Sequence, residues 1–213
     1  MLLNDDVKIE VRETFKDLKD KIKLIAFTQK IECHYCEENR KLAQVISELS
    51  DRIQLEIYDF QQDKEMAEKY GIDKIPALVV MGEDRDDHIR FFGMPGGYEF
   101  TSLIEAVRTV SGSESALSEE TRKYLDGLDT DIHLQVFVTP TCPYCPPAVI
   151  LAHQMAQYSD HVRADMVESI EFPHLANRYN IQGVPRTVIN ETEYLEGAAP
   201  EAALIEKIKK ALE

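Results

Sequence analysis

The four cysteines of this 213-residue chain are the residues whose type and spacing could do chemistry. They form two Cys-x-x-Cys pairs, Cys33 with Cys36 and Cys142 with Cys145, so no thiol is left for a bridge between distant elements. Secreted disulfide scaffolds distribute their cysteines along the chain, whereas close pairs in a reducing compartment indicate metal binding or redox catalysis. The pattern therefore predicts either a metal site or two redox sites.

The position of each pair favours redox chemistry. Each pair follows a predicted strand and opens a predicted helix, where free N–H groups and partial positive charge would stabilise a thiolate. Cys33 and Cys142 are then the predicted exposed nucleophiles, and Cys36 and Cys145 are the cysteines that resolve a mixed disulfide. Two intervening residues allow the Cα separation of roughly 5.5–6 Å that a disulfide accepts.

The chain contains an internal repeat. Residues 69–80 match residues 178–189, and the same offset of 109 residues relates Cys33 to Cys142, Cys36 to Cys145 and Pro76 to Pro185. Residues 22–27 match residues 132–137 at an offset of 110, so one connecting loop differs in length. The elements on either side of that loop keep their register, as duplicated folded units do.

Both repeats have the same predicted order of elements. The first is expected to contain helices over 5–20, after the Cys pair, over 63–70 and over 98–110, and strands over 23–28, 53–60, 77–81 and 89–92. The polar segment 111–115 is the predicted linker. The second repeat opens on a helix capped by Ser118 and ends on a helix from about Pro200. The fold class is α/β, with one unit over 1–112 and another over 117–213, each a mixed central sheet flanked by helices.

Further motifs carry a family resemblance. Ile75-Pro76 and Val184-Pro185 each precede a strand, residues 139–145 read Thr-Pro-Thr-Cys-Pro-Tyr-Cys, and unit 1 has Cys-His-Tyr-Cys in the same frame. Each unit resembles the thioredoxin/glutaredoxin superfamily. The two together, from about residue 5 to the C-terminus, resemble the protein disulfide oxidoreductases of thermophilic bacteria and archaea, so two tandem thioredoxin-like folds are expected.

The resemblance implies an activity and its partners. It implies a thiol–disulfide oxidoreductase that reduces, oxidises or isomerises protein disulfides through both Cys pairs, with no cofactor besides the redox-active disulfides. It implies that Pro76 and Pro185 are cis and face the thiols, and that Ile75 and Val184 offer backbone N–H and C=O groups to substrate. Residues 197–200 lack the Gly-Gly followed by acidic residues with which glutaredoxins bind glutathione. A thioredoxin-reductase-like flavoprotein is therefore the expected electron donor.

Residues inside the two motifs have proposed roles. A cationic His34 would stabilise the neighbouring thiolate, while the alternative is a solvated side chain at a helix start. Tyr35 and Tyr144 are expected to pack over the active-site turn and shape substrate access, or to be simple surface aromatics. Pro143 pre-sets φ at an early helical position.

Other residues near the motifs carry two further expectations. Pro146 and Pro147 are expected to loosen the start of the helix if Cys142 or Thr141 caps it. Glu56 and Asp165, also 109 residues apart, are candidate proton-transfer carboxylates behind the resolving cysteines. Solvation on the outer face of their strands is the alternative.

Composition excludes several other classes of function. The formal net charge is −15 and there is no run of basic residues, which argues against binding to nucleic acid. The N-terminus lacks the features of a signal peptide and the apolar runs are too short to cross a bilayer, so a cytoplasmic protein is expected.

Two rival interpretations remain. Structural zinc would need both Cys pairs at one site, but zinc ribbons usually place their pairs ~15–20 residues apart. Cys36 and Cys142 are much farther apart in sequence, so no metal is expected. A purely binding module of the same fold is the other rival, although such modules typically lack one or both cysteines.

Overall fold

The computed structural model describes residues 3–213, and its elements follow the predicted repeat. The first half contains α1 (Asp5–Thr14), a 3-10 turn (Phe15–Asp17), β1 (Ile22–Thr28), α2 (Cys36–Ser47), β2 (Ile53–Asp59), α3 (Lys64–Lys69), β3 (Ala77–Gly82), β4 (Ile89–Phe92) and α4 (Glu99–Val110). The second half contains α5 (Glu119–Asp126), β5 (Ile132–Val138), α6 (Cys145–Tyr158), β6 (Val162–Glu168), α7 (Pro173–Arg178), β7 (Arg186–Ile189), β8 (Glu193–Glu196) and α8 (Glu201–Ala211). The two tandem thioredoxin-like folds are confirmed, while the boundary at residues 113–116 stays a prediction.

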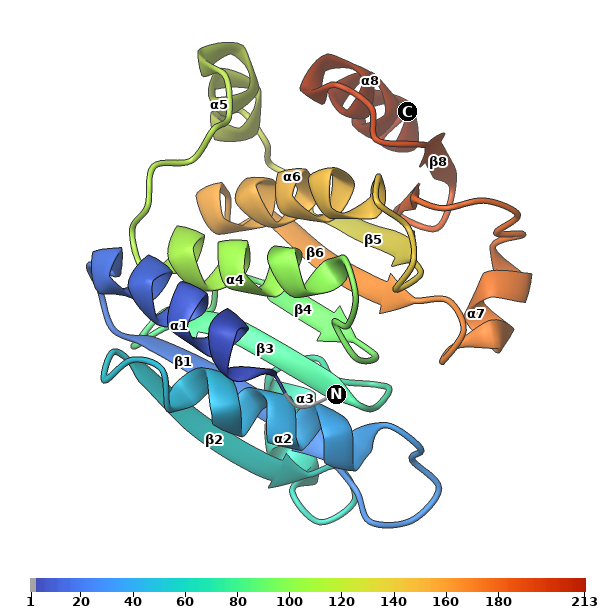
Figure 1. Cartoon of the computed structure of the whole chain (residues 1–213). Helices are drawn as coiled ribbons and strands as arrows, with labels where there is room; N and C mark the ends of the chain where they lie inside the picture. The colour runs from blue at the N-terminus through green and yellow to red at the C-terminus, as the bar shows by residue number, and fades with distance from the viewer. Residues whose placement is uncertain (1–2) are drawn as a thin grey trace.

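The two halves form one continuous sheet of eight strands, in the order β2-β1-β3-β4-β6-β5-β7-β8 (Figure 1). Each half has the same internal strand order, and the last strand of unit 1 lies beside the edge strand of unit 2. This junction is a parallel pairing of β4 with β6, from Ile89 opposite Ala164 to Phe92 opposite Val167. The repeat of the sequence is therefore a head-to-tail repeat of the sheet.

Both Cys pairs lie at the same edge of this sheet. β1 is antiparallel to β3 and β3 to β4, while β4 is parallel to β6 and β6 to β5. β1 and β5 therefore run in the same direction, and the loops that follow them leave the sheet at one edge. Four strand spacings of ~4.8 Å place the two strands roughly 19 Å apart.

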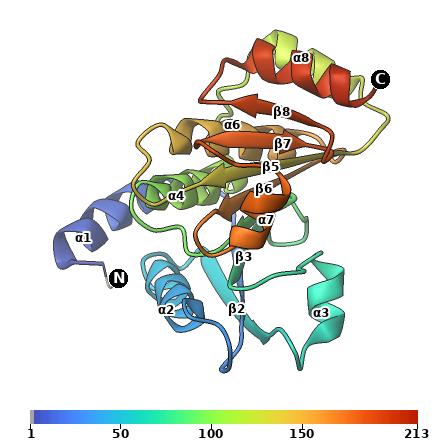
Figure 2. The same ribbon diagram turned by 90° about the vertical axis from the view of Figure 1, so that its right-hand side faces the viewer.

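Helices cover both faces of the sheet, with α2, α4 and α6 together on one face and α3 on the other (Figures 1 and 2). α4 of unit 1 packs against α6 of unit 2, so the junction is covered as well as paired. The larger apolar core lies under α2, α4 and α6. A smaller core on the other face contains Phe27, Phe137 and the aromatic side chains beside α3 and α7.

The ends of the helices follow local sequence signals with one exception. Ser118 caps α5 as predicted, since its hydroxyl oxygen accepts the N–H of Thr121 at 3.2 Å. Asn4 caps α1 in the same way by accepting the N–H of Val7 at 2.8 Å. The helix expected over 5–20 ends earlier, because the chain tightens into a 3-10 turn at the buried Phe15 and becomes extended at Leu18. Within residues 3–213, no helix has the length and apolarity needed to span a bilayer.

Candidate active site

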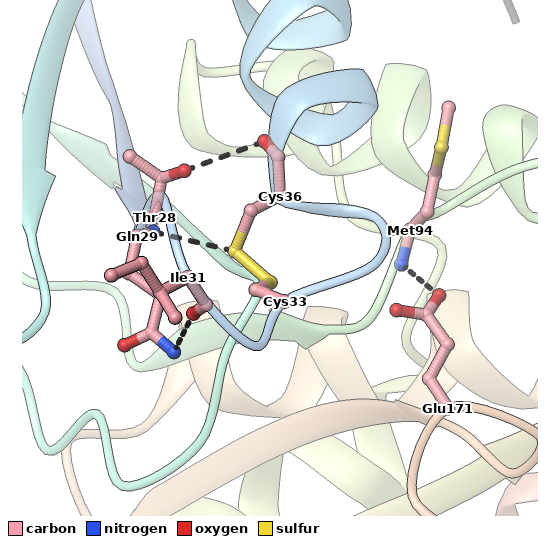
Figure 3. Close-up of a disulfide and its surroundings, with 7 residues drawn as sticks. All are labelled: Thr28, Gln29, Ile31, Cys33, Cys36, Met94 and Glu171. Atoms are coloured by element: carbon pink, nitrogen blue, oxygen red, sulfur yellow. Dashed lines mark hydrogen bonds between the residues drawn. A yellow bond between two sulfur atoms is a disulfide. The ribbon is translucent and has the colours of Figure 1, made fainter.

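The first site lies in the loop between β1 and α2, where Cys33 and Cys36 form a disulfide with Cα atoms 5.4 Å apart. Cys33 is half-buried and Cys36 is buried. The backbone N–H of Gln29 lies 3.4 Å from the Cys36 sulfur and points to it, and the Thr28 hydroxyl donates to the Cys36 carbonyl oxygen at 3.4 Å (Figure 3). The end of β1 therefore holds the second cysteine against the sheet and leaves the first cysteine outward.

The second site has the same construction. Cys142 and Cys145 form a disulfide with Cα atoms 5.5 Å apart, at 8% and 0% exposure. The N–H of Cys145 donates to the Cys142 carbonyl oxygen at 3.4 Å, which closes the turn. In both pairs the first cysteine is the more exposed one, although Cys142 is nearly buried and less open than predicted. The assignment of Cys33 and Cys142 as nucleophiles stays a prediction that this geometry supports.

The two proline segments have the same backbone conformation. The Ile75-Pro76 and Val184-Pro185 peptide bonds are both cis, which confirms the expectation from the family resemblance. The Cys142 sulfur lies 3.7 Å from the Val184 carbonyl oxygen. Pro76 and Pro185 are buried, while Ile75 and Val184 are half-buried beside them. In unit 2 the backbone before the proline therefore lies next to the thiols, and the role of Ile75 and Val184 in binding substrate stays a prediction.

The two helices begin at the second cysteine of each pair. Tyr35 and Tyr144 are the N-caps of α2 and α6, and neither cap residue makes a side-chain capping hydrogen bond. In α2, free N–H groups of the first turn therefore lie beside the sulfurs, as expected for a site that stabilises a thiolate, whereas Pro146 and Pro147 leave α6 with fewer such donors. Because Tyr144 is the cap, Pro146 and Pro147 occupy the second and third helical positions, where an N–H has no partner within the helix. The cap at Cys142 or Thr141, on which the expected loosening of the helix depended, is therefore not present.

The other motif residues lie at the surface. Tyr144 is 72% exposed, and Pro143 and His34 are also exposed. The rings of His34 and Tyr35 meet edge to face with centroids 4.7 Å apart. Tyr144 thus projects into solvent, while the ring of Tyr35 packs against His34. Their roles in substrate access, and that of His34 in thiolate stabilisation, stay predictions.

The two candidate carboxylates lie in different environments. Glu56 is half-buried and accepts a hydrogen bond from the Tyr58 hydroxyl at 2.9 Å. Asp165 is fully buried, and its oxygens accept hydrogen bonds from His133 at 2.6 Å and from Arg163 at 2.9 and 3.2 Å. Burial raises the pKa of Asp165, but the hydrogen bonds and charges of these partners outweigh it and hold the pKa well below the usual range.

For Asp165, the alternative of solvation on an outer face is therefore wrong. β6 is not an edge strand of the whole sheet, because β4 pairs with it and places Arg90 opposite Asp165. An aspartate held ionised in this way does not take up a proton near neutral pH, which argues against proton transfer by Asp165. The corresponding role of Glu56 stays a prediction.

Sequence reasoning missed a second group of carboxylates, those at the junction of the two units. Glu99, the first residue of α4, is 1% exposed and accepts a hydrogen bond from the Ser102 hydroxyl at 2.7 Å. Burial raises the pKa of Glu99 to about 7. The N–H of Tyr98 donates to the Pro140 carbonyl oxygen at 3.0 Å, so Glu99 begins its helix beside the segment that leads to Cys142.

The signal that could have revealed this contact is the Gly96-Gly97 dipeptide. Gly97 has φ +58°, and a Cβ at this position would collide with the Pro140 carbonyl group. Only glycine combines this backbone conformation with so close an approach of two chain segments. The Gly-Gly pair therefore marks the place where unit 1 meets the active-site loop of unit 2.

The site geometry excludes a shared zinc ion. The two Cys pairs follow strands roughly 19 Å apart, whereas four thiolates around one zinc ion would each lie ~2.3 Å from the metal. Among the described residues there is no group of three or more His, Cys, Asp or Glu side chains placed to hold a metal ion. Cys33 instead opens onto a groove of about 680 Å³ whose wall includes Gln29, His34 and Ile57.

Comparison with known families agrees with this geometry. A family model described as a thioredoxin domain matches residues 21–105 and 132–210, one match for each half. The chain belongs to the thioredoxin domain family. Each of the two matches contains one of the Cys pairs.

Two solved structures resemble the whole chain. A protein disulfide oxidoreductase from Aeropyrum pernix is 27% identical with a TM-score of 0.92, and the match covers 99% of this chain and 94% of that one. A variant of the alkylhydroperoxide reductase protein AhpF from Enterococcus faecalis is 26% identical with a TM-score of 0.90, covering 98% of this chain and 100% of that one.

Curated relatives are longer proteins. The corresponding alkyl hydroperoxide reductase protein of Escherichia coli is 22% identical over 212 residues, which is all of this chain but 38% of that protein. An NADH dehydrogenase of Bacillus subtilis is 21% identical over 197 residues, or 92% of this chain and 36% of that protein. The chain therefore spans less than two fifths of the length of these relatives.

Proposed function

We propose that the chain exchanges thiols and disulfides with protein substrates at both Cys pairs. The observation that carries this proposal is the common geometry of the two sites. In each, a more exposed first cysteine precedes a buried second cysteine that opens a helix, and the unit also carries a cis-proline before a strand. The 3.7 Å contact between the Cys142 sulfur and the Val184 carbonyl oxygen fixes that arrangement in unit 2.

The exchange proceeds in two steps. In the reducing direction, the Cys33 thiolate attacks one sulfur of a substrate disulfide, a new S–S bond forms, and the second substrate sulfur leaves as a thiolate that takes a proton from water. The Cys36 thiolate then attacks the Cys33 sulfur, which closes the protein disulfide and releases the first substrate thiolate. Two electrons pass from the dithiol to the substrate, and the same steps in reverse oxidise a substrate dithiol.

The surroundings of the cysteines support these steps. The Gln29 N–H that points to the Cys36 sulfur, together with the N-terminus of α2, would stabilise negative charge on a departing or attacking sulfur. In unit 2 the N-terminus of α6 would act on Cys145 with fewer N–H donors, because Pro146 and Pro147 have none.

Electrons for continued reduction must come from another protein or domain. We infer that the donor is a nicotinamide-dependent flavoprotein of the thioredoxin-reductase type, acting in the cytoplasm. The support is that the matching segment forms part of longer proteins, an alkyl hydroperoxide reductase protein and an NADH dehydrogenase. A test is NADPH or NADH oxidation by purified thioredoxin reductase with this protein and insulin present.

The activity itself is tested by insulin reduction with a set of cysteine variants. We expect activity from Cys33→Ser/Cys36→Ser and from Cys142→Ser/Cys145→Ser, because each keeps one complete site, and none from the fourfold variant. A fourfold variant as active as the wild type would refute the proposal. A folded wild-type protein without any disulfide reduction would favour the purely binding module instead.

A further inference from the structure

A second, smaller groove lies between the two units, at the edge of the sheet that carries both Cys pairs. Its volume is about 240 Å³, and it is lined from unit 1 by Tyr35, Glu38 and Met94 and from unit 2 by Glu168, Ile170 and Glu171. Tyr35 lies between Cys33 and Cys36 in the sequence, and Figure 3 shows Met94 and Glu171 on the other side of the loop that carries the Cys33–Cys36 disulfide. A residue next to a cysteine bound at Cys33 can therefore reach this groove.

The walls of the groove are apolar and open. Ile170 is 67% exposed, and Tyr35 is also exposed, although both are large apolar side chains. Met94 is half-buried between them and the core. These side chains could cover the aliphatic part of a long side chain while its polar end reaches farther in.

The inner part of the groove is acidic. Glu168 is 3% exposed, and its Oε2 accepts the N–H of Glu171 at 2.7 Å, while its buried Oε1 has no hydrogen-bond partner among the described residues. Glu171 Oε1 accepts the N–H of Met94 at 2.7 Å. With Glu38, three carboxyl groups line the groove, and no described lining residue is lysine, arginine or histidine.

Burial has a measurable consequence for these carboxyl groups. It raises the pKa of Glu168, and it raises the pKa of Glu171 to about 7. The groove thus combines an unpaired carboxyl oxygen with the absence of a cation that would stabilise its charge.

We propose that this groove binds a lysine or arginine side chain of the polypeptide substrate, near the cysteine that Cys33 attacks. The aliphatic stem lies against Tyr35, Met94 and Ile170, and the cation pairs with the carboxylates behind them. The net charge of −15 attracts the same substrates over a longer range. This proposal rests on the proposed function, and it gives unit 2 a specificity role in catalysis at unit 1.

The test uses the Cys142→Ser/Cys145→Ser variant, in which only unit 1 can react. The protein is reduced, freed of reductant and mixed with peptides whose single cysteine carries a nitrothiobenzoate group, and the coloured thiol released in a single turnover gives the rate. Arginine, leucine or glutamate is placed at each of three positions on either side of the cysteine. Arginine at one position should raise the second-order rate constant about tenfold over leucine, and glutamate should lower it.

Variants locate the preference in the groove. Glu171→Gln and Glu168→Gln, each added to the single-site protein, should remove most of the preference for arginine, because each removes one negative charge from the groove. The local structure should be kept, because a glutamine oxygen can still accept the Met94 or Glu171 N–H. Glu206→Gln removes the same charge from an exposed position on α8 and should leave the preference unchanged. If one glutamate variant fails to fold, Ile170→Ser offers a third test. It should also weaken the preference for arginine, because it removes an apolar contact of the aliphatic part of the substrate side chain.

Three outcomes would overturn the inference. They are equal rates for arginine and leucine at every position, a preference for leucine, or an arginine preference that both glutamine variants retain. Ellman's reagent, which has no flanking side chain, separates this from the proposed function. Failure of the reduced protein to react with that reagent would refute disulfide exchange at unit 1, whereas reaction without an arginine preference would refute only the groove assignment.

Discussion

Replacing Glu99 by glutamine is expected to change how the stability of the protein depends on pH. Glu99 begins α4 at 1% exposure, Ser102 donates to its Oε2, and its Oε1 has no hydrogen-bond partner among the described residues. Burial raises its pKa to about 7. Glutamine has the shape of the protonated carboxyl group but does not titrate, so the variant isolates the cost of the charge.

The magnitude follows from the shift in pKa. A shift from 4.5 to about 7, at 1.36 kcal/mol for each pKa unit, corresponds to about 3 kcal/mol in the free energy of unfolding. The unfolded chain releases this proton near pH 4.5 and the folded protein only near pH 7. The contribution of Glu99 to the free energy of unfolding is therefore fully present below about pH 4.5 and is lost as the pH rises to about 7. Glu99→Gln should match the wild type at pH 4 and exceed it by up to about 3 kcal/mol at pH 8.

Urea unfolding of the oxidised protein, followed by circular dichroism at pH 4, 5.5, 7 and 8, measures this difference. Using the difference between variant and wild type cancels the contributions of other titrating groups, such as Glu171 and Asp165. Glu206→Gln, at an exposed position on α8, is the matched control and should show no such pH-dependent gain. A Glu99→Gln difference that is constant with pH, or largest at pH 4, would refute the reasoning about burial.

Three further predictions concern the cysteines, the histidine and the junction. Limiting iodoacetamide should label Cys33 and Cys142 in the reduced protein before the buried Cys36 and Cys145. Mass spectrometry of the peptides gives the order of labelling, and the reverse order would reassign the nucleophiles. His34→Ala should make unit 1 less oxidising in a redox-buffer titration of the Cys142→Ser/Cys145→Ser variant, because a histidinium stabilises the thiolate of the reduced form. Each tenfold change in the equilibrium constant is ~30 mV, and an unmoved potential removes His34 from the mechanism. Gly97→Ala should lower the free energy of unfolding by at least ~1 kcal/mol more than Gly197→Ala does. Both glycines have positive φ, but only Gly97 lies against another segment of the chain. Equal losses in urea unfolding would contradict the close contact.

The repeated architecture and the core of both sites could be predicted because their signals are local. Period-two and period-3.6 patterns and the Ser118 cap specify elements one at a time, and the repeat supplies the order of the elements twice. The Cys pairs and the two prolines lie at fixed offsets within these elements. Their meeting at the sheet edge therefore followed once the strand-to-helix order was known.

The errors arose where distant segments meet. The alternating pattern of its strand places Asp165 on the polar face and so indicates exposure to solvent. Only the pairing of β4 with β6 buries it beside His133 and Arg163. Nothing in the local pattern of either strand specifies that pairing. The loosening expected from Pro146 and Pro147 depended on a helix cap at Thr141 or Cys142. The cap is instead Tyr144, so both prolines lie in the first turn, where they cost no hydrogen bond within the helix.

The junction also brings segments with acidic residues toward the active-site loop of the other unit. A parallel join of β4 with β6 brings the loop after β4 against the loop after β6, where Gly93 leaves room for Glu168 and Glu171. Four residues farther on, Gly97 allows the start of α4, with Glu99, to lie against Pro140 in the loop before Cys142. One strand pairing thus places Glu168 and Glu171 of unit 2 in a groove with Tyr35 of unit 1, and starts α4 of unit 1 against the loop that leads to Cys142. A disulfide exchange centre is sensitive to the charge near its thiolates, so we expect carboxyl groups at this junction to influence the redox chemistry of the neighbouring unit.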